Sequence, residues 1–238
     1  MNGKINGMIV HNMKYDQYLF HCSMLPLLMT KSRVKDSLSE TTKTELTKIW
    51  IEKEYGRKRD ITTKFTEKGI ICEQDSIELL GKKWGDKNTF KKNTVLYSNE
   101  FITGTPDIVG EVLFDIKTSW DLLSYVQSDE DKARKNYYYQ LLGYMALVGT
   151  KKGHIAYCLV DTPKLFIDDE LYRFSFKNDT SSPEYKEKEK EIIKLMTFGD
   201  IPEDKRVKIF DFEFNKEDID AVYLKVAEWR KYLNELHL

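Results

Sequence analysis

The first ninety residues show the hydrophobic pattern of helices. Residues 37–56 carry apolar side chains at helical spacing, and one face of this predicted helix is formed by Leu46, Ile49 and Trp50. Ser37 and Glu40 match a capping box at its start, and Gly56 provides a stop signal at its end. A second helical pattern covers residues 64–82. The beginning of the chain is therefore predicted to be mainly helical.

The middle of the chain changes between strand and helix patterns. Residues 93–120 contain short apolar runs broken by Asn and Gly, which is typical of successive strands. Residues 132–149 are apolar nearly all round, which predicts a buried helix. A continuous apolar run at 154–160, bounded by Gly153 and Pro163, predicts a central strand.

The last third of the chain mixes both patterns. Apolar and polar positions alternate in residues 171–177, which predicts a strand with Tyr172, Phe174 and Phe176 on one face. Ser182 and Pro183 mark the start of a helix, and residues 206–214 alternate again. The final stretch, 217–236, predicts a helix. Its apolar stripe is formed by Ile219, Val222, Val226, Trp229 and Leu233.

This order of elements predicts an α/β fold with a mixed central β-sheet flanked by α-helices. The chain has 238 residues, so we expect a single domain over residues 1–238. It would consist of a helical part at about 1–90, the main sheet at about 91–165, and further strands and helices at about 166–238.

Composition narrows the classes of function. Hydrophobic residues make up 41% and aromatic residues 13%, which indicates a packed core rather than disorder. No segment approaches the roughly 18 to 20 apolar residues of a membrane span, and no signal peptide is evident. The three cysteines are scattered, and the four histidines lack i, i+4 spacing, so neither a zinc site nor an iron–sulfur cluster is indicated. With a net charge of −1, binding to nucleic acid would need a local basic surface.

One apolar hairpin contains charged side chains. In GTPDIVGEVLFDIKTSW, Asp107 precedes a predicted turn at Gly110–Glu111, and Asp115 and Lys117 follow it. Because strand side chains alternate between faces, Asp115 and Lys117 share one face, and antiparallel pairing puts Asp107 opposite Phe114 or Asp115. Two carboxylates in close approach raise each other's pKa unless a cation joins them, and Mg²⁺ prefers carboxylate oxygens. The hairpin therefore predicts a metal site with a lysine that can act on water or on a phosphate.

Each of these signals has an ordinary structural alternative. An Asp–Lys pair on the wet face of a surface hairpin would look the same in sequence. Glu73, at helical spacing from Gly69 and Ile77, lies on a predicted inward face and needs a partner there, unless the helix is rotated and Glu73 is solvated. Gln140 and Tyr144, at i and i+4 on the predicted buried helix, either support a site or bond to the core backbone.

Four short motifs nevertheless follow one another in a recognisable order between about residues 65 and 145. They are Gly69-x-x-x-Glu73, Gly104-Thr-Pro-Asp107, Asp115-Ile-Lys117 and Gln140-x-x-x-Tyr144. Together they resemble the PD-(D/E)xK nuclease superfamily, in the branch of the lambda exonuclease, YqaJ-like viral recombinase and RecB-type nuclease domains. The resemblance implies a restriction-endonuclease-like core and one nuclease domain. The second acid is Asp115 where many relatives have Glu, and the cluster-bearing relatives have four cysteines where this chain has three.

The resemblance also implies the residues that handle the metal. Asp107 and Asp115 would ligate a divalent cation together with the backbone carbonyl of Ile116. Glu73 would bind or orient the metal from its helix. Lys117 would position the nucleophilic water.

Contacts to DNA are implied in the same way. Gln140 and Tyr144 would support the site and touch DNA near the scissile phosphate, and Ser23 and Thr105 would bind a terminal phosphate. Basic residues that are expected to contact phosphates, with a solvated loop as the alternative, are Arg57, Lys58, Arg59, Arg134 and Lys135.

The first functional hypothesis is a Mg²⁺-dependent DNA exonuclease of phage type, acting in recombination or end processing, with Mn²⁺ able to substitute. The second is a structure-specific or site-specific DNA endonuclease on the same core. The third is a catalytically inactive DNA-binding module, against which the intact acid–acid–lysine set argues. The resemblance implies DNA, a single-strand annealing protein and a homo-oligomer as partners, no membrane, and the cytoplasm of a bacterial or phage-infected cell.

Overall fold

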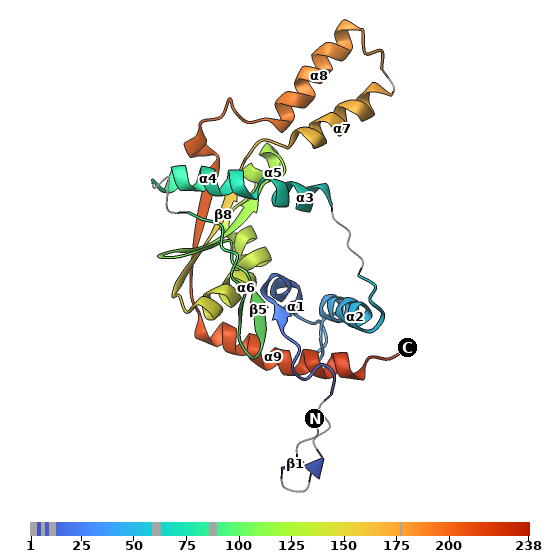
Figure 1. The fold of residues 1–238 in the computed structure, drawn as a ribbon, viewed down its shortest axis with the longest axis vertical. Coiled ribbons are helices and arrows are strands. Elements are labelled where there is room, and N and C mark those ends of the chain that lie inside the picture. The colour runs from blue at the N-terminus through green and yellow to red at the C-terminus, as the bar shows by residue number, and fades with distance from the viewer. Residues whose placement is uncertain (1–3, 6–7, 10–12, 59–62, 86–89, 177) are drawn as a thin grey trace.

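The structure is a computed structural model that describes residues 4–5, 8–9, 13–58, 63–85, 90–176 and 178–238. Its first part is mainly helical, as predicted (Figure 1). The elements up to residue 85 are β1 (Lys4–Ile5), β2 (Met8–Ile9), β3 (Phe20–His21), the 3-10 helix η1 (Cys22–Met24), α1 (Leu25–Leu28), α2 (Glu40–Tyr55), α3 (Lys64–Ile71) and α4 (Glu73–Trp84).

The rest of the chain alternates between strands and helices. The predicted strands at 154–160 and 206–214 are confirmed, with slightly different ends, as β8 and β9. The elements are β4 (Tyr97–Ser98), β5 (Ile102–Gly104), β6 (Ile108–Val109), β7 (Leu113–Thr118), α5 (Leu122–Val126), α6 (Glu130–Val148), β8 (Lys152–Cys158), α7 (Lys164–Ser175), α8 (Pro183–Met196), the 3-10 helix η2 (Glu203–Lys205), β9 (Val207–Glu213) and α9 (Lys216–Glu235).

The main sheet is mixed, which confirms the predicted fold class. Its strand order is β6-β7-β8-β9, with β7 and β8 parallel and the two outer pairs antiparallel. Ile108 pairs with Phe114 across the β6–β7 hairpin, so the predicted antiparallel hairpin is confirmed. A smaller sheet has the order β3-β5-β4. Its central strand β5 ends at Gly104, and the Gly-Thr-Pro-Asp segment leads from there into β6.

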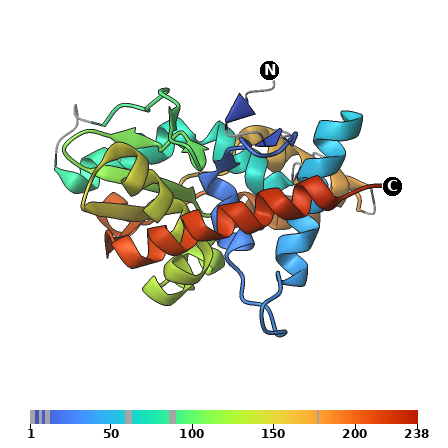
Figure 2. The ribbon, with the colours of Figure 1, turned by 90° about the horizontal axis from the view of Figure 1, so that it is seen from below.

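Helices cover the two faces of the main sheet. α6 packs on the face that carries Leu113 and Ile155, whereas α4 packs on the face that carries Phe114 and Ala156. Because strand side chains alternate, Asp115 and Lys117 lie on the α6 face, as predicted for residues that share the parity of Leu113. α9 runs along the body beside α2 and α6 (Figure 2), and all five residues of its predicted apolar stripe are buried. No helix in the described part of the chain is long and apolar enough to cross a membrane.

The helix predicted over residues 64–82 is two helices. α3 ends at Ile71, and α4 begins at Glu73 after a non-helical Cys72. The side chain of Cys72 is buried in the core under α4, whereas Ile70 is 67% exposed. A single continuous helix would have put Ile70, Glu73 and Ile77 on one stripe. The break at Cys72 gives α3 a different rotation, so that Lys68 is the buried residue of α3 and Ile70 is exposed.

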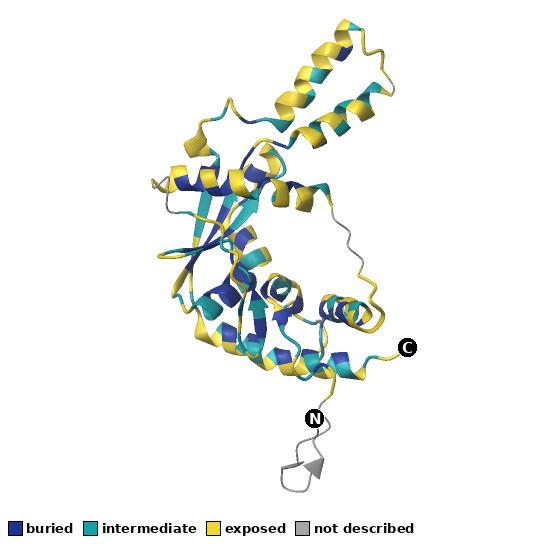
Figure 3. Cartoon of the chain, viewed as in Figure 1, coloured by how far each residue is buried: buried dark blue, intermediate teal, exposed yellow. Residues whose placement is uncertain are grey.

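The strand predicted at residues 171–177 is wrong, because α7 is helical there as far as Ser175. Aromatic residues at 172, 174 and 176 fit a two-residue alternation, but positions 172 and 176 are also i, i+4 neighbours on a helix. In the structure Tyr172 packs edge-on against Phe176, and Phe174 stacks on Tyr185 of α8. α7 and α8 form a hairpin that extends away from the sheet, with most of its surface exposed (Figure 3).

The capping box predicted at Ser37 and Glu40 is shifted. Ser39 is the N-cap residue of α2, and its hydroxyl accepts a hydrogen bond from the backbone N–H of Thr42. The Ser39 hydroxyl also forms hydrogen bonds with the hydroxyls of buried Thr42 and exposed Thr30, which anchor the start of α2. The predicted end at Gly56 is confirmed, as is Ser182 as the cap of α8.

Candidate active site

The candidate site lies at an open edge of β7. Within the described residues, β6 pairs with β7 only at Ile108 and Val109, and the chain before Ile108 lies outside the sheet, so the edge of β7 beyond Phe114 has no strand partner on that side. The carboxylate of Asp107 takes the place of a strand there, because its Oδ2 accepts a hydrogen bond of 2.6 Å from the backbone N–H of Ile116. The N–H and C=O of one strand residue point toward the same edge. The carbonyl of Ile116 therefore faces the same side as Asp107.

Asp115 is the buried member of the pair, with a residue exposure of 2%. Its Oδ1 accepts a hydrogen bond of 3.1 Å from Gln140 Nε2, and Gln140 in turn donates to the hydroxyl of Tyr144 at 3.2 Å. Burial and the nearby charge of Asp115 raise the pKa of Tyr144, so its hydroxyl stays protonated. Gln140 and Tyr144, predicted as an i, i+4 pair on α6, are thus joined to Asp115 by a hydrogen-bonded chain.

Lys117 lies beside Asp115 on the same face of β7. Its Nζ is 2.7 Å from Asp115 Oδ2, and 19% of its side chain is exposed. Burial alone would lower the pKa of Lys117, but the charges of Asp115 and Asp107 outweigh it, so the pKa is raised and the ammonium stays charged.

Asp107 has an unusual environment for a carboxylate. Burial and the charge of Asp115 raise the pKa of Asp107 from 3.8 to about 7, although the Ile116 N–H and the Lys117 ammonium act in the opposite direction. Glu73 adds to this rise, which places its charge near Asp107. Glu73 lies in the first turn of α4, is half-buried, and forms an ion pair with Lys92. The structure therefore brings Glu73 to the edge of the site, but from the start of a helix rather than from its middle.

This raised pKa has a consequence for stability. Folded protein without metal holds the Asp107 proton more tightly than unfolded protein, so the linked stabilisation is full below about pH 4 and is lost as pH rises through about 7. Asp107→Asn removes this titration. Its Tm relative to wild type should be a few degrees higher at pH 8 than at pH 5, since ~1 kcal/mol shifts Tm by roughly 2–4 °C in a protein of this size. Thermal unfolding in EDTA at both pH values measures this; a Tm difference that does not change with pH would contradict it.

The residues that flank the site approach each other closely. A Cβ atom on Gly104 would lie 2.6 Å from Tyr144 Cε1, and one on Gly143 would lie 2.8 Å from Cys22 Sγ. These two glycines and Cys22 let β5, η1 and α6 pack together behind Asp115. Gly69, by contrast, has no atom of the described residues within 4 Å of such a Cβ position.

Two residues at the site were missed by sequence reasoning. Asn93 fixes the segment before β6, because its backbone N–H donates to the carbonyl of Asp107 at 2.8 Å and its side chain donates to the carbonyl of Pro106 at 3.0 Å. Tyr137 of α6 lies over Lys117, with its ring centroid 4.4 Å from Nζ. Asn93 lies among other polar residues and Tyr137 among other tyrosines, so the local sequence does not single out either residue as part of the site.

The residues predicted to contact DNA are spread over the surface. Ser23 is exposed, and its hydroxyl lies 3.2 Å from His21 Nδ1; Thr105 is half-buried two residues before Asp107. Arg57 and Lys58 are exposed just after α2, and Arg59 lies outside the described residues.

The two basic residues predicted on α6 are both exposed. Arg134 pairs with Glu130 and lies over the rings of Tyr138 and Phe212, while Lys135 is a neighbour on the same turn. The contacts of Arg134 thus involve α6 and β9 rather than the carboxylate pair.

The oxygen atoms of the site fit a divalent cation. Asp115 Oδ2 is buried and, among the described residues, accepts no hydrogen bond of good geometry, although the Lys117 ammonium lies near it. Such an oxygen, beside a second carboxylate with a raised pKa and a backbone carbonyl, fits a cation that prefers oxygen ligands. Within the described residues no three His, Cys, Asp or Glu side chains are already gathered around one point. The candidate metal ligands are therefore the carboxylates of Asp107 and Asp115 and the carbonyl of Ile116, while Glu73 forms its ion pair with Lys92.

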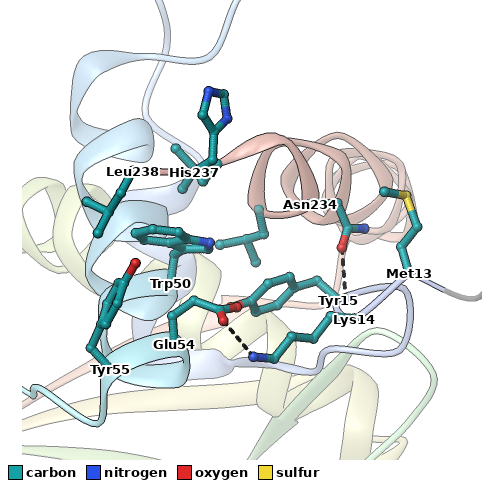
Figure 4. Close-up of a pocket in the computed structure, with 11 residues that line it drawn as sticks. Met13, Lys14, Tyr15, Trp50, Glu54, Tyr55, Asn234, His237 and Leu238 are labelled. Carbon is teal, nitrogen blue, oxygen red and sulfur yellow. Dashed lines mark hydrogen bonds and ion pairs between the residues drawn. The ribbon is translucent and has the colours of Figure 1, made fainter.

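A pocket of about 400 Å³ lies elsewhere, between α2, the end of α9 and residues 13–15 (Figure 4). Glu54 receives an ion pair from Lys14 and a hydrogen bond of 2.7 Å from the Tyr15 hydroxyl, and the Tyr15 N–H donates to Asn234. These contacts tie the N-terminal segment to α2 and α9. None of the residues that line this pocket belongs to the predicted site.

Comparison with solved structures gives matches that span most of both chains. A phage-related exonuclease from Haemophilus somnus 129PT has a TM-score of 0.76 and 26% sequence identity, over 92% of this chain and 95% of that chain. An alkaline exonuclease from Laribacter hongkongensis has a TM-score of 0.60 and 12% identity, over 92% of this chain and 89% of that one. The same enzyme in complex with dAMP has a TM-score of 0.57 and 13% identity, over 90% and 87%. No protein-family model and no curated protein matches the chain.

The shared fold and the likeness to the Haemophilus protein over nearly the full length of both chains define the class: this protein is a nuclease, and the likeness supports its resemblance to the PD-(D/E)xK superfamily. The phage-related neighbour also supports the resemblance to the branch of the lambda exonuclease and the YqaJ-like recombinases.

Proposed function

We propose that this nuclease is a Mg²⁺-dependent DNA exonuclease of phage type. The observation that carries the proposal is the convergence of Asp107 and Asp115 at the open edge of β7, with Lys117 Nζ 2.7 Å from a buried Asp115 oxygen. The fold shared with exonucleases supports exonuclease activity, and the neighbour bound to dAMP supports a deoxynucleotide substrate.

The roles of the site residues follow from their positions. Asp107, Asp115 and the carbonyl of Ile116 would hold the cation, with Glu73 reaching it once Lys92 releases its carboxylate. When bound, the cation would act as a Lewis acid on the phosphate and lower the pKa of a bound water. Gln140 keeps Asp115 in place by its hydrogen bond of 3.1 Å.

The chemical step is hydrolysis of a phosphodiester. A water oxygen forms a bond to phosphorus, the bond from phosphorus to the leaving oxygen breaks, and one water proton is lost while the leaving oxygen gains a proton. The Lys117 ammonium can donate a hydrogen bond to the water oxygen or to a phosphate oxygen, where it stabilises the charge that develops. Exposed Ser23, which follows the Cys22 that lies beside Gly104, and half-buried Thr105, two residues before Asp107, are proposed to bind a terminal phosphate.

Other parts of the proposal concern partners and setting. Arg57, Lys58, Arg59, Arg134 and Lys135 are proposed to contact phosphates along the DNA, as the near-neutral net charge requires a local basic surface. A role in recombination or end processing, a single-strand annealing partner, a homo-oligomer and a cytoplasmic setting rest on the resemblance and stay predictions.

One experiment separates the proposal from its rivals. Linear duplex DNA and covalently closed circular DNA are incubated with the protein in Mg²⁺, in Mn²⁺ and in EDTA. An exonuclease degrades only the linear DNA, in Mg²⁺ or Mn²⁺, and is inactive in EDTA. Cleavage of the closed circle would instead support an endonuclease, and binding of both DNAs without cleavage in either metal would support an inactive module.

Glu73 gives a graded prediction. Glu73→Gln removes a negative charge near the metal but leaves Asp107 and Asp115 in place, so we expect a roughly 10- to 100-fold lower apparent Mg²⁺ affinity, of the size found for outer-shell changes. Activity should recover in part at high Mg²⁺. A Mg²⁺ titration of the cleavage rate measures this, with Glu78→Gln, an exposed glutamate on the same helix, as the control. An unchanged titration curve for Glu73→Gln would mean that Glu73 serves only its ion pair with Lys92.

A further inference from the structure

The Lys117 ammonium has two neighbours that hold it. One is Asp115 Oδ2 at 2.7 Å, and the other is the ring of Tyr137, whose centroid lies 4.4 Å from Nζ. An ammonium within about 6 Å of a ring centroid is attracted by the negative face of the ring. The lysine stem is long and flexible, so a carboxylate alone leaves the ammonium free to swing around it. The ring supplies a second, fixed point.

Tyr137 is placed by the helix that also positions Asp115. It lies three residues before Gln140, so both side chains point from the same side of α6 toward β7. Gln140 donates to one oxygen of Asp115, while Tyr137 lies over the lysine that contacts the other oxygen. One face of α6 therefore contacts both the Asp115 carboxylate and the Lys117 ammonium and fixes their positions.

Other aromatic residues support the Tyr137 ring. Tyr157, which is paired with Lys117 across β7 and β8, packs edge-on against Tyr137 with ring centroids 6.2 Å apart. Phe210 of β9 packs in the same manner against Tyr157 at 5.9 Å. Burial raises the pKa of Tyr157, so this residue stays neutral. The series fixes the ring that Lys117 faces.

We infer that Tyr137 is a positioning residue of the nuclease site: the face of its ring holds the Lys117 ammonium against the carboxylate pair, where it can act on the water and the phosphate. This inference rests on the proposed function and adds a residue to it. Because Tyr137 acts on the orientation of Lys117, its loss should slow the chemical step and leave the metal ligands and the binding of DNA intact.

The test compares substitutions that keep or remove the ring. Tyr137→Phe keeps the ring and should retain kcat within about twofold of wild type. Tyr137→Leu removes the ring and should lower kcat by roughly 3- to 30-fold, the range expected for a cation–π contact, with KM for linear duplex DNA and the calorimetric affinity for Mn²⁺ unchanged. Tyr139→Leu is the matched control, since Tyr139 is another half-buried tyrosine on α6 but packs on Tyr138 and faces the loop before α2. It should behave like wild type.

A second series keeps the test decisive if Tyr137→Leu does not fold. Fluorinated phenylalanines at position 137 keep the size of the ring but withdraw electrons from its face, so kcat should fall stepwise as fluorines are added, which a purely structural role would not produce. Equal kcat across that series, wild-type kcat in a folded Tyr137→Leu, loss of activity in Tyr137→Phe, or an effect on KM alone would each overturn the inference. An inactive wild-type protein would instead overturn the proposed function itself.

Discussion

Asp115→Asn should abolish Mg²⁺-dependent cleavage of DNA. Asparagine keeps the size of the side chain and can still bond to Gln140, but it removes the buried negative charge that would bind the cation. Metal catalysis contributes several kcal/mol to such reactions, and each 1.36 kcal/mol is a factor of ten in rate, so we expect a loss of at least ~10³-fold in kcat/KM. The measurement is the initial rate on linear duplex DNA in Mg²⁺, together with calorimetric binding of Mn²⁺.

The control for this prediction is Glu111→Gln. This substitution also replaces a carboxylate by an amide, but in the exposed turn between β6 and β7, four residues from Asp115. It should have no effect on cleavage. Cleavage by Asp115→Asn at more than about a tenth of the wild-type rate would show that Asp115 is not a metal ligand. Loss of activity without loss of Mn²⁺ binding would assign it a role in orienting Lys117.

Lys117→Ala should be nearly inactive while it still binds metal. Removal of one donor that stabilises transition-state charge costs about 10²- to 10³-fold in kcat. Removal of a positive charge 2.7 Å from Asp115 Oδ2 should leave Mn²⁺ affinity unchanged or higher. Single-turnover cleavage at saturating Mg²⁺ and calorimetry with Mn²⁺ measure the two effects.

Lys152→Ala provides the comparison, because Lys152 begins the neighbouring strand β8 with 70% of its side chain exposed and pairs with Glu213, a surface glutamate. It should cleave at the wild-type rate. If Lys117→Ala loses metal binding and unfolds at a lower temperature, Lys117 is a structural ion-pair partner of Asp115 rather than part of the chemistry.

The parts of the site that depend on strand parity could be read from the sequence. Side chains of a strand alternate by covalent geometry, so once β7 was recognised, Asp115 and Lys117 had to share the face of Leu113. The hydrogen bond from Ile116 to Asp107 could not be read in this way. It depends on β6 beginning only at Ile108, so that the chain before Ile108 does not pair with β7 beyond Phe114, and a two-residue strand has too weak a pattern to reveal where it begins.

The helical part of the site was less predictable. The position of Glu73 was inferred from one unbroken helix, and the break at Cys72 changed the rotation of everything before it. The aromatic spacing at 172, 174 and 176 fits both a strand and a helix, and packing against α8 decided for the helix.

Three adjacent tyrosines show why local sequence cannot assign such roles. Tyr137 lies over Lys117, Tyr138 donates to Asp218 at 2.6 Å, and Tyr139 lines the surface near the loop before α2. The three are alike in sequence, and only their rotation about α6 separates them. The contacts of each tyrosine depend on which element, distant in sequence, packs against the side of α6 from which that tyrosine projects.

The central claim is that a divalent cation binds between Asp107 and Asp115 at the open edge of β7. Anomalous diffraction from crystals of the wild-type protein soaked in Mn²⁺ tests this directly. The predicted result is one strong anomalous peak in contact with both carboxylates and the carbonyl of Ile116, and its loss in Asp115→Asn crystals soaked in the same way. A peak at another group of side chains, with Asp107 still bonded only to Ile116 and Asp115 only to Gln140 and Lys117, would contradict it.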